Sequence, residues 1–363
     1  MKNTFGNNIS VTVFGESHGA SIGAVLDGLP AGIEVNEDFI REVLSLRRPS
    51  GNISTPRQEA DEFAIHSGVF NNKTTGTPIC ITIPNNNVKS KDYDELKGIA
   101  RPSHADFTAH SKYNGFEDYR GGGHFSGRVT AGLCAVGAIV LSALKSKGIF
   151  IGTHIKSCAG IEDKNFENYL DDINALFKKQ FATLSDVSEE KMKEAIEEAR
   201  NEGDSVGGIL ETAVVGVPVG VGEPFFDSLE SVISHAVFSI PAVKGIEFGL
   251  GFGFADKKGS EANDSFEICD GKVVTKTNNS GGINGGISNG MPIVFKTVIR
   301  PTPTISKEQN TVNFEKMENV ILKAGGRHDP AIIHRARMVV DCVVAIAVAD
   351  LLAGRYGTDW LCK

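Results

Sequence analysis

The sequence reads GGGHFSGRVTA at residues 121–131 and AGGRHDPAIIHR at residues 324–335, and each stretch leads from glycines and basic side chains into an apolar run. The apolar runs, near 128–144 and 338–353, carry apolar side chains on too many sides to lie on a surface. Both runs predict buried helices that need cover on two faces. Strands rich in valine and isoleucine are available to cover them, so we expect helices packed between sheets.

Turn signals recur in nearly the same order along the two halves of the chain. The pairs are GLPAG (28–32) and GVPVG (216–220), GTPICITI (76–83) and GMPIVFKTV (290–298), RPS (101–103) and RPT (300–302), and HADFTAH (104–110) and HDPAIIH (328–334). This order predicts a single domain over 1–363 with pseudo-repeat halves at approximately 9–148 and 205–353. Symmetry between the halves would bring His124 and Arg128 near Arg327, His328 and Asp329.

Several elements can be placed from local signals. Strands are expected over 9–14 and 21–27, and a helix over 36–47 with Asn36 as its N-cap and acidic residues in its first turn. An amphipathic helix is expected over 188–202, with its end at Gly203.

Composition excludes several classes of protein. The 363 residues are 40% hydrophobic and 23% charged, which is typical of a globular protein. The net charge of −8 argues against general binding to nucleic acid or anionic membranes. The six cysteines show no regular framework, so we expect a reducing, cytoplasmic compartment. No signal peptide is visible, and the two apolar runs fall short of the ~20 residues that span a membrane.

The glycine-rich loop at 121–131 has the chemistry of an anion site. Its glycines allow backbone amides to approach a ligand, and His124, Ser126 and Arg128 add an imidazole, a hydroxyl and a cation. A helix beginning there would add unpaired amides and a positive dipole end. A flexible turn is the alternative. Other arginines also lie in or beside Gly/Pro loops and suit phosphate or carboxylate groups: Arg47, Arg48, Arg57, Arg101, Arg300 and Arg327.

Two other kinds of site are possible from single motifs. GESHG at 15–19 matches the G-x-S-x-G pattern of a serine hydrolase with Ser17 as nucleophile, although it follows the first strand and no βαβ alternation follows. A metal site would need histidines at helical spacing, and the pairs His104/His110 and His328/His334 are six residues apart. We therefore expect no protein-bound metal. The glycine loop lacks a Walker lysine, which argues against a P-loop NTPase.

Six ordered blocks resemble the chorismate synthase family. They are GESHG (15–19), RPSHADFT (101–108), YRGGGHFSGRVTA (119–131), GEPFFD (222–227), VKGIEFG (243–249) and GRHDP (326–330). The resemblance covers nearly the whole chain. It implies an α+β fold, a β-α-β sandwich with long central helices between antiparallel sheets and an internal pseudo-two-fold repeat, assembled as a homotetramer.

The activity implied is that of a carbon–oxygen lyase, EC 4.2.3.5. Such an enzyme converts 5-enolpyruvylshikimate 3-phosphate to chorismate and phosphate by anti-1,4-elimination, the last step of the shikimate pathway in aromatic amino acid biosynthesis. The resemblance also implies a requirement for reduced FMN (FMNH2) without net redox change. A non-catalytic flavin carrier or structural oligomer is a further alternative.

The resemblance also assigns roles to residues of this chain. His18 resembles the histidine near the substrate phosphate, His104 the histidine near the flavin ring, and Asp329 the acid beside flavin N5 that relays the proton lost from substrate C6. The substrate-binding arginines implied are Arg47, Arg101, Arg128 and Arg327. The FMN contacts implied are His124, Phe125, Ser126, Pro241, Ala242, Gly285, Arg300, Pro301, Thr302, Pro303, Thr304 and Arg327.

The sequence differs from many relatives in a segment that bears on the source of the reduced flavin. Ile53 and its neighbours stand where a further arginine is often found, and Arg57 is a candidate to replace it. This departure argues against a direct site for NADPH, the NADP-linked reductant. We expect an external flavin reductase to supply FMNH2.

Overall fold

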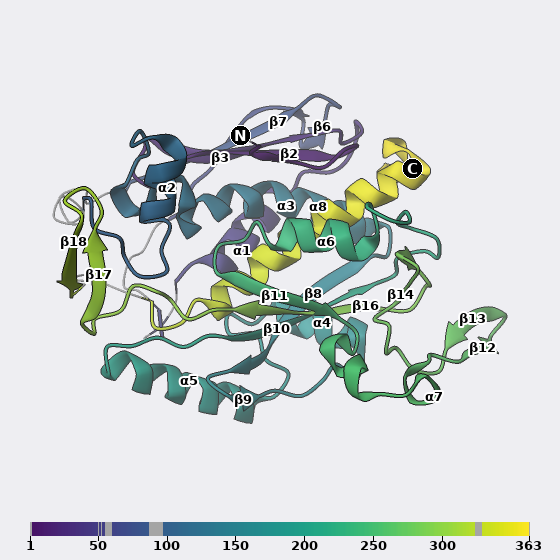
Figure 1. Cartoon of the computed structure of the whole chain (residues 1–363). Coiled ribbons are helices and arrows are strands. Elements are labelled where there is room, and N and C mark those ends of the chain that lie inside the picture. The colour runs from purple at the N-terminus through teal and green to yellow at the C-terminus, as the bar shows by residue number, and fades with distance from the viewer. Residues whose placement is uncertain are drawn as a thin grey trace.

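Two antiparallel five-stranded sheets enclose a layer of helices in the computed structural model, which describes residues 2–49, 51, 53–54, 60–86, 97–323 and 329–362 (Figure 1). The first sheet has the order β1 (Thr4–Phe5), β2 (Ser10–Gly15), β3 (Ser21–Asp27), β7 (Ile79–Pro84), β4 (Ala64–Ser67). The second has the order β11 (Val243–Phe248), β16 (Ile293–Ile299), β10 (Gly208–Val215), β8 (Phe150–Cys158), β9 (Ile161–Glu162). The predicted α+β sandwich of helices between antiparallel sheets is confirmed.

The central layer consists of α1 (Glu37–Arg47), α3 (Thr130–Ser146), α6 (Leu229–Val237) and α8 (Ile333–Tyr356). Helix α3 packs on β3 and β7, α8 packs on β8 and β10, and the two helices contact each other. Most residues of both helices are buried, as the apolar runs predicted. Asn36 caps α1 by accepting a hydrogen bond from the Phe39 amide, also as expected.

The internal repeat is visible in the strand order. Strands β2, β3, β7 and β4 are arranged as β8, β10, β16 and β11 are in the other sheet, and each set is interleaved with two of the central helices. On this topology the second half begins at β8, earlier in the chain than the boundary expected at residue 205. The GLPAG and GVPVG turns follow the equivalent strands β3 and β10.

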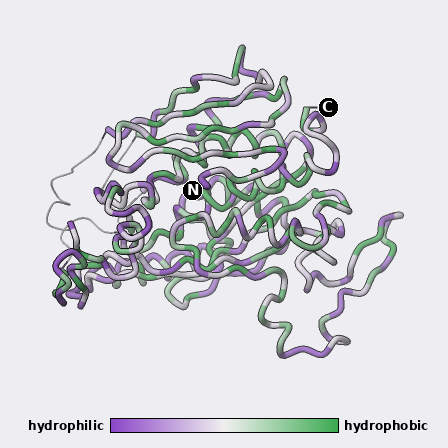
Figure 2. Tube along the Cα trace, turned by 45° about the horizontal axis from the view of Figure 1, so that its top comes forward, coloured by the Kyte–Doolittle hydropathy of each residue, from purple (hydrophilic) through white to green (hydrophobic). Residues whose placement is uncertain are grey.

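The remaining elements lie outside this core (Figures 1 and 2). Helices α4 (Tyr169–Phe177) and α5 (Asp186–Asn201) lie beyond the second sheet, and α2 (Asp106–Tyr113) lies near the hairpin β17 (Gln309–Asn313) and β18 (Glu318–Leu322). The hairpin β12 (Phe266–Cys269) and β13 (Lys272–Thr275) projects from the body. The shorter elements are β5 (Val69–Phe70), β6 (Lys73–Thr74), β14 (Ile283–Asn284), β15 (Ile287–Ser288), α7 (Gly259–Ala262), η2 (Arg120–Phe125), η3 (Gly127–Val129), η4 (Gly251–Asp256) and η5 (Thr358–Leu361).

Strand β8 is bonded through its side chains on both faces of the sheet. His154 lies 3.0 Å from both Asp163, which follows β9, and Glu211 of the neighbouring strand β10. Burial alone would lower the pKa of His154, but these two carboxylates outweigh it and raise the pKa. The preceding Thr153 points to the opposite face, where it donates to Asp341 of α8 at 2.6 Å. The bond from Thr153 thereby joins the second sheet directly to the central helix layer.

One segment, Gly127–Ser146, is long and apolar enough to cross a membrane, and 78% of its most apolar window is buried inside the fold. The segment has 20 residues, so the expectation that this run falls short of membrane-spanning length was wrong. The reason is that η3 and α3 join into one apolar stretch. Its burial between sheets is what a core helix requires.

Candidate functional site

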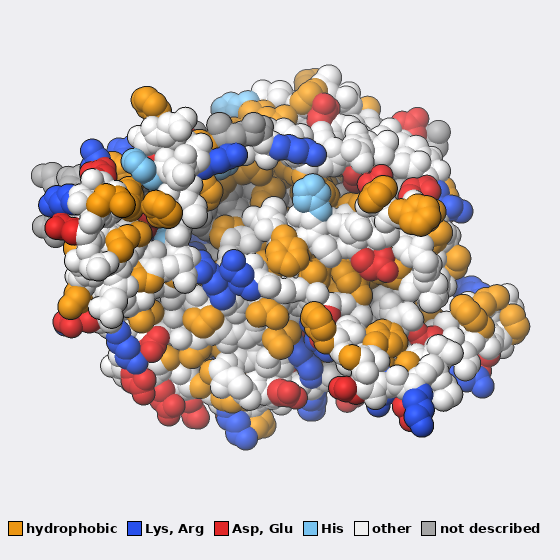
Figure 3. Space-filling model, in the orientation of Figure 1, with side chains coloured by type: hydrophobic (Ala, Val, Ile, Leu, Met, Phe, Trp, Pro, Cys, Tyr) orange, Lys and Arg blue, Asp and Glu red, His pale blue; other side chains and the backbone are white. Residues whose placement is uncertain are grey.

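A cavity of about 990 Å³ lies at the N-terminal ends of α3 and α8 and at the C-terminal end of α1. Figure 3 shows a hollow on this face with Lys and Arg side chains around it. Residues from both halves of the chain line the cavity, including His124 and Arg128 of the first half and Asp329 of the second. Symmetry between the halves was the reason to expect these three residues together. His328 and Arg327, expected beside them, lie outside the described residues.

The three glycines at 121–123 form a tight turn that leaves room for two histidines. Their φ angles of +59°, +82° and +52° lie in the left-handed region, which disfavours other residues. A Cβ on Gly121 would lie 2.2 Å from the His18 ring, and one on Gly122 would lie 3.2 Å from the His104 ring. The turn thus packs against both rings, whereas α3 begins later, at Thr130. The glycine loop therefore leads into the apolar helix expected from the run near 128–144.

An arginine cluster surrounds one buried carboxylate in the cavity wall. Asp61 Oδ1 accepts a hydrogen bond from Arg128 Nη1, and Asp61 Oδ2 lies 3.5 Å from Arg47 Nη2 and 3.9 Å from Arg48 Nε. Arg335, in the first turn of α8, donates to Asp329 Oδ2 at 2.8 Å and to the carbonyl oxygen of Arg47 at 3.1 Å. Four arginines and two aspartates therefore share one region of the wall.

Part of the hydrogen-bonding capacity of this wall is unused. Among the described residues, the Nε atoms of Arg47, Arg48 and Arg300 are buried without a hydrogen-bond partner. Thr302, which lines the same cavity, has an Oγ1 atom that is also buried without a hydrogen-bond partner among these residues. A buried guanidinium nitrogen without an acceptor is costly, and an oxyanion supplies acceptors that satisfy it. The wall therefore suits a ligand that carries phosphate or carboxylate groups.

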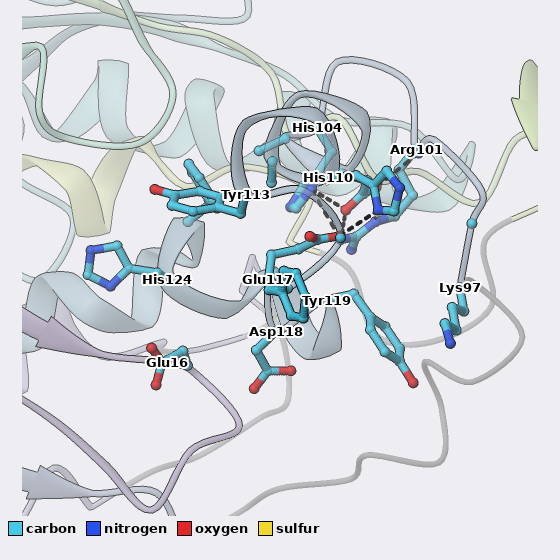
Figure 4. Close-up of a pocket in the computed structure, with 18 of the residues that line it drawn as sticks. Glu16, Lys97, Arg101, His104, His110, Tyr113, Glu117, Asp118, Tyr119 and His124 are labelled. Atoms are coloured by element: carbon cyan, nitrogen blue, oxygen red, sulfur yellow. Dashed lines mark hydrogen bonds and ion pairs between the residues drawn. The ribbon is translucent and has the colours of Figure 1, made fainter. Parts of the chain in front are cut away.

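His104 stands between this cavity and a second one of about 470 Å³, and it lines both (Figure 4). His104 Nδ1 lies 2.8 Å from Asp106 Oδ1, so the N–H of Nδ1 donates to the carboxylate and Nε2 is left for other partners. Arg101 donates to both oxygens of Asp106, at 2.8 and 2.6 Å. Burial alone would raise the pKa of Asp106, but the bonds to Arg101 and His104 outweigh it and lower the pKa. Asp106 thus fixes the orientation of the His104 ring.

His18 and Ser17 lie behind the glycine turn and line neither of the two cavities. Ser17 is fully buried; its Oγ lies 3.1 Å from His18 Nδ1 and donates to the Gly121 carbonyl at 3.0 Å. A hydrolytic nucleophile must reach its substrate. The buried position of Ser17 argues against the serine hydrolase.

The structure gathers most, but not all, of the residues predicted for the site. The main cavity is lined by Arg47, His104, His124, Phe125, Ser126, Arg128, Pro241, Ala242, Arg300, Thr302, Pro303, Thr304 and Asp329. Arg101 lines the second cavity, and Gly285 lies in the turn between β14 and β15, away from both. Pro301, like His18, is not in the lining of either cavity. Arg327 and Arg57 lie outside the described residues.

Two charged residues of the wall, Asp61 and Arg335, were not singled out from the sequence. Arg335 belongs to the stretch 324–335, so its position beside the loop was an available signal. Asp61 stands in no recognised motif, and nothing local shows that it meets Arg128. Within the described residues, no group of three or more His, Cys, Asp or Glu side chains is arranged to hold a metal ion.

Comparisons with known proteins agree with this geometry. The chorismate synthase family model matches residues 9–353. A chorismate synthase of Pyrococcus abyssi is 46% identical over 96% of this chain and 97% of its own length, and one of Chitinophaga pinensis is 47% identical over 96% of each chain. A crystal structure of a chorismate synthase superposes with a TM-score of 0.75 at 29% identity, covering 97% of this chain and 93% of the other. The chain is therefore an enzyme of the chorismate synthase family.

Proposed function

We propose that the chain converts 5-enolpyruvylshikimate 3-phosphate to chorismate and phosphate by anti-1,4-elimination, the last step of the shikimate pathway. The substrate loses a proton from C6 and its phosphate from C3, so one C–H and one C–O bond break and a conjugated diene forms. The observation that carries the proposal is the arginine-rich wall of the cavity, where, in the described part of the chain, the buried Nε atoms of Arg47, Arg48 and Arg300 have no hydrogen-bond partner. A substrate with two carboxylates and a phosphate would supply the missing acceptors.

The size and the lining of the cavity also support a flavin site. Its volume of about 990 Å³ lies at the upper end of the range for small-molecule sites, which leaves room for a cofactor beside a substrate. Phe125 is 40% exposed and supports contact with a planar ring, and Arg300 and Thr302 have unused donors for a flavin phosphate. Reduced FMN would supply an electron-rich ring that helps the phosphate leave without being consumed in the net reaction.

The protein's own groups divide the remaining work. Arg47 and Arg128 bind and orient the anionic groups of the substrate, and Asp329, held by Arg335, accepts the proton from C6. His104, oriented by Asp106, offers Nε2 towards the cofactor. His18 is packed against Gly121, which lines the cavity, while His18 itself does not. In this proposal the leaving phosphate approaches Gly121, and His18 acts on it there.

An anaerobic assay tests the reaction. The chain is mixed with substrate and either reduced or oxidised FMN, and chorismate and phosphate are measured together. Equal amounts of both products with reduced FMN, and the flavin still reduced at the end, are expected. Turnover with oxidised FMN alone would contradict the mechanism. Binding of FMN without release of phosphate would instead support a flavin carrier.

We also propose that the enzyme assembles as a homotetramer and receives FMNH2 from an external reductase in the cytoplasm. Large apolar side chains on the outside of the chain support assembly, since Phe225 is 86% exposed, Phe226 90% and Phe252 85%. The six free cysteines suit a reducing compartment. Sedimentation should give four times the chain mass of 38.7 kDa, and a monomer would refute the assembly.

A further inference from the structure

Asp61 is a buried acidic residue whose partners lie on other elements of the fold. Its side chain has no exposed surface, yet it is charged and lies in the wall of the main cavity. Its backbone has a φ of +52°, in the left-handed region that aspartate and asparagine tolerate better than most residues. A buried carboxylate is stable only when partners satisfy both of its oxygens. Its partners here are arginines on two separate elements.

Those arginines would repel one another without a shared anion. Arg47 ends α1 and Arg128 lies in η3, and both side chains are only 6% exposed, so water screens their charges poorly. Asp61 places one oxygen on each of them, and Arg48 approaches the same Oδ2. The carboxylate thereby brings guanidinium groups from two parts of the chain to one point.

The two arginines depend on Asp61 to different extents. Arg128 also donates from Nε to Asn85 Oδ1 at 3.1 Å and from Nη2 to the Pro84 carbonyl at 3.2 Å. Within the part of the chain that the structure describes, Arg47 has weaker support, since its other bond runs to the Gly127 carbonyl at 3.4 Å and its Nε has no hydrogen-bond partner. Removal of the charge on Asp61 would therefore affect the position of Arg47 most.

We propose that Asp61 is a positioning residue, which aims Arg47 and Arg128 at a single oxyanion of the ligand, a phosphate or a carboxylate. The inference rests on the proposed function for the identity of that ligand. A carboxylate this close to an anion site can act in the opposite way, by competing with the ligand for the same nitrogens. The full burial of the Asp61 side chain places it behind the arginines, which favours positioning.

The test uses Asp61→Asn, which keeps the size and the tolerance for positive φ but removes the charge. Binding of inorganic phosphate and of 5-enolpyruvylshikimate 3-phosphate is measured by calorimetry without flavin, and kcat and KM are measured with reduced FMN. Kd and KM should rise roughly ten-fold or more, as for residues of one ion-pair network, with a smaller change in kcat. In an Arg47→Gln background the effect of Asp61→Asn on Kd should shrink, because part of it passes through Arg47.

The matched control is Asp350→Asn. Asp350 is also a buried aspartate, but it accepts hydrogen bonds from the backbone amides of Asn7, Asn8 and Ile9 and lines neither cavity. It should lower Tm without changing Kd or KM. If Asp61→Asn does not fold, Asp61→Glu displaces the charge instead, and a rise in Kd is again expected.

Two outcomes overturn the role of Asp61. An unchanged Kd with a lowered Tm would make Asp61 structural only, and a lower Kd would make it a competitor of the ligand. Failure of the proposed function has a different signature. In that case the native chain forms no chorismate, while Asp61→Asn still weakens phosphate binding. A native chain that binds neither phosphate nor the substrate would refute the anion site itself.

Discussion

Gly137→Ala should destabilise the protein, although alanine is the better helix former. Gly137 lies in α3 where it crosses α8, and a Cβ there would lie 2.5 Å from Cys342 Cβ, 3.0 Å from its Cα and 3.1 Å from its carbonyl oxygen. The helical gain from glycine to alanine is about 1 kcal/mol. Overpacking of a close-packed core costs about 1–3 kcal/mol, and the contact here is with the backbone of α8, which cannot rotate away. The upper end of that range, about 3 kcal/mol, applies to a contact with backbone atoms. After the helical gain of about 1 kcal/mol is subtracted, the net loss of stability is about 2 kcal/mol.

The same substitution should also change the geometry of the candidate site. Arg128 lies just before α3, while Asp329 and Arg335 lie at the start of α8, so the spacing of the two helices sets the distance across the cavity. Forcing the helices apart should lower Tm by roughly 3 °C and raise KM. Thermal unfolding followed by circular dichroism, together with steady-state kinetics, measures both effects.

Gly354→Ala is the control for this prediction. A Cβ on Gly354, also in α8, would meet only the side-chain Nδ2 of Asn8 at 3.2 Å, and that side chain can move. This variant should be as stable as the native protein or more stable by up to about 1 kcal/mol. If Gly137→Ala proves as stable as Gly354→Ala, the close approach of α3 and α8 is not as tight as the structure indicates.

Three further predictions concern single charged groups. His18→Ala and Asp329→Ala should each slow turnover by roughly 10²-fold or more, as for general acid–base groups, and a native-like kcat in either variant would remove that assignment. Asp106 has a lowered pKa, so its stabilisation is complete above the ordinary aspartate pKa of 3.8 and is lost as pH falls below it. Asp106→Asn should therefore be less stable at pH 7 and should lose less Tm than the native protein between pH 5 and 3; parallel curves would contradict this reasoning. His154 has a raised pKa, so its contribution to stability is complete below the ordinary histidine pKa of 6.5 and is lost as pH rises through the pKa of the folded protein. His154→Gln should be destabilised more at pH 6 than at pH 9 in urea unfolding, and an equal loss at both would show that its charge is not involved.

The secondary structure could be predicted where its signals are local. The cap at Asn36 and the strand over 21–27 depend on residues within a few positions of each other, and both were found where expected. The two buried helices followed from runs that have no polar face, because such helices must be covered on both sides. The start of α3 at Thr130 also lies close to the apolar run expected near 128–144, but the conformation of the three glycines before it could not be predicted. Their left-handed backbone is fixed by the packing of His18 and His104 against them.

For the candidate site, too, local features could be predicted from the sequence and contacts between distant segments could not. The sequence alone determined which residue types are available for an oxyanion, because arginines beside glycine and proline turns have that chemistry wherever they lie. Only the tertiary structure decided which of them meet. Arg47, Asp61, Arg128 and Arg335 are brought together by the packing of α1, α3 and α8, whereas Arg101 turns to Asp106 and the second cavity. Distances across a packed core are set by many side chains at once, and no short stretch of sequence contains them.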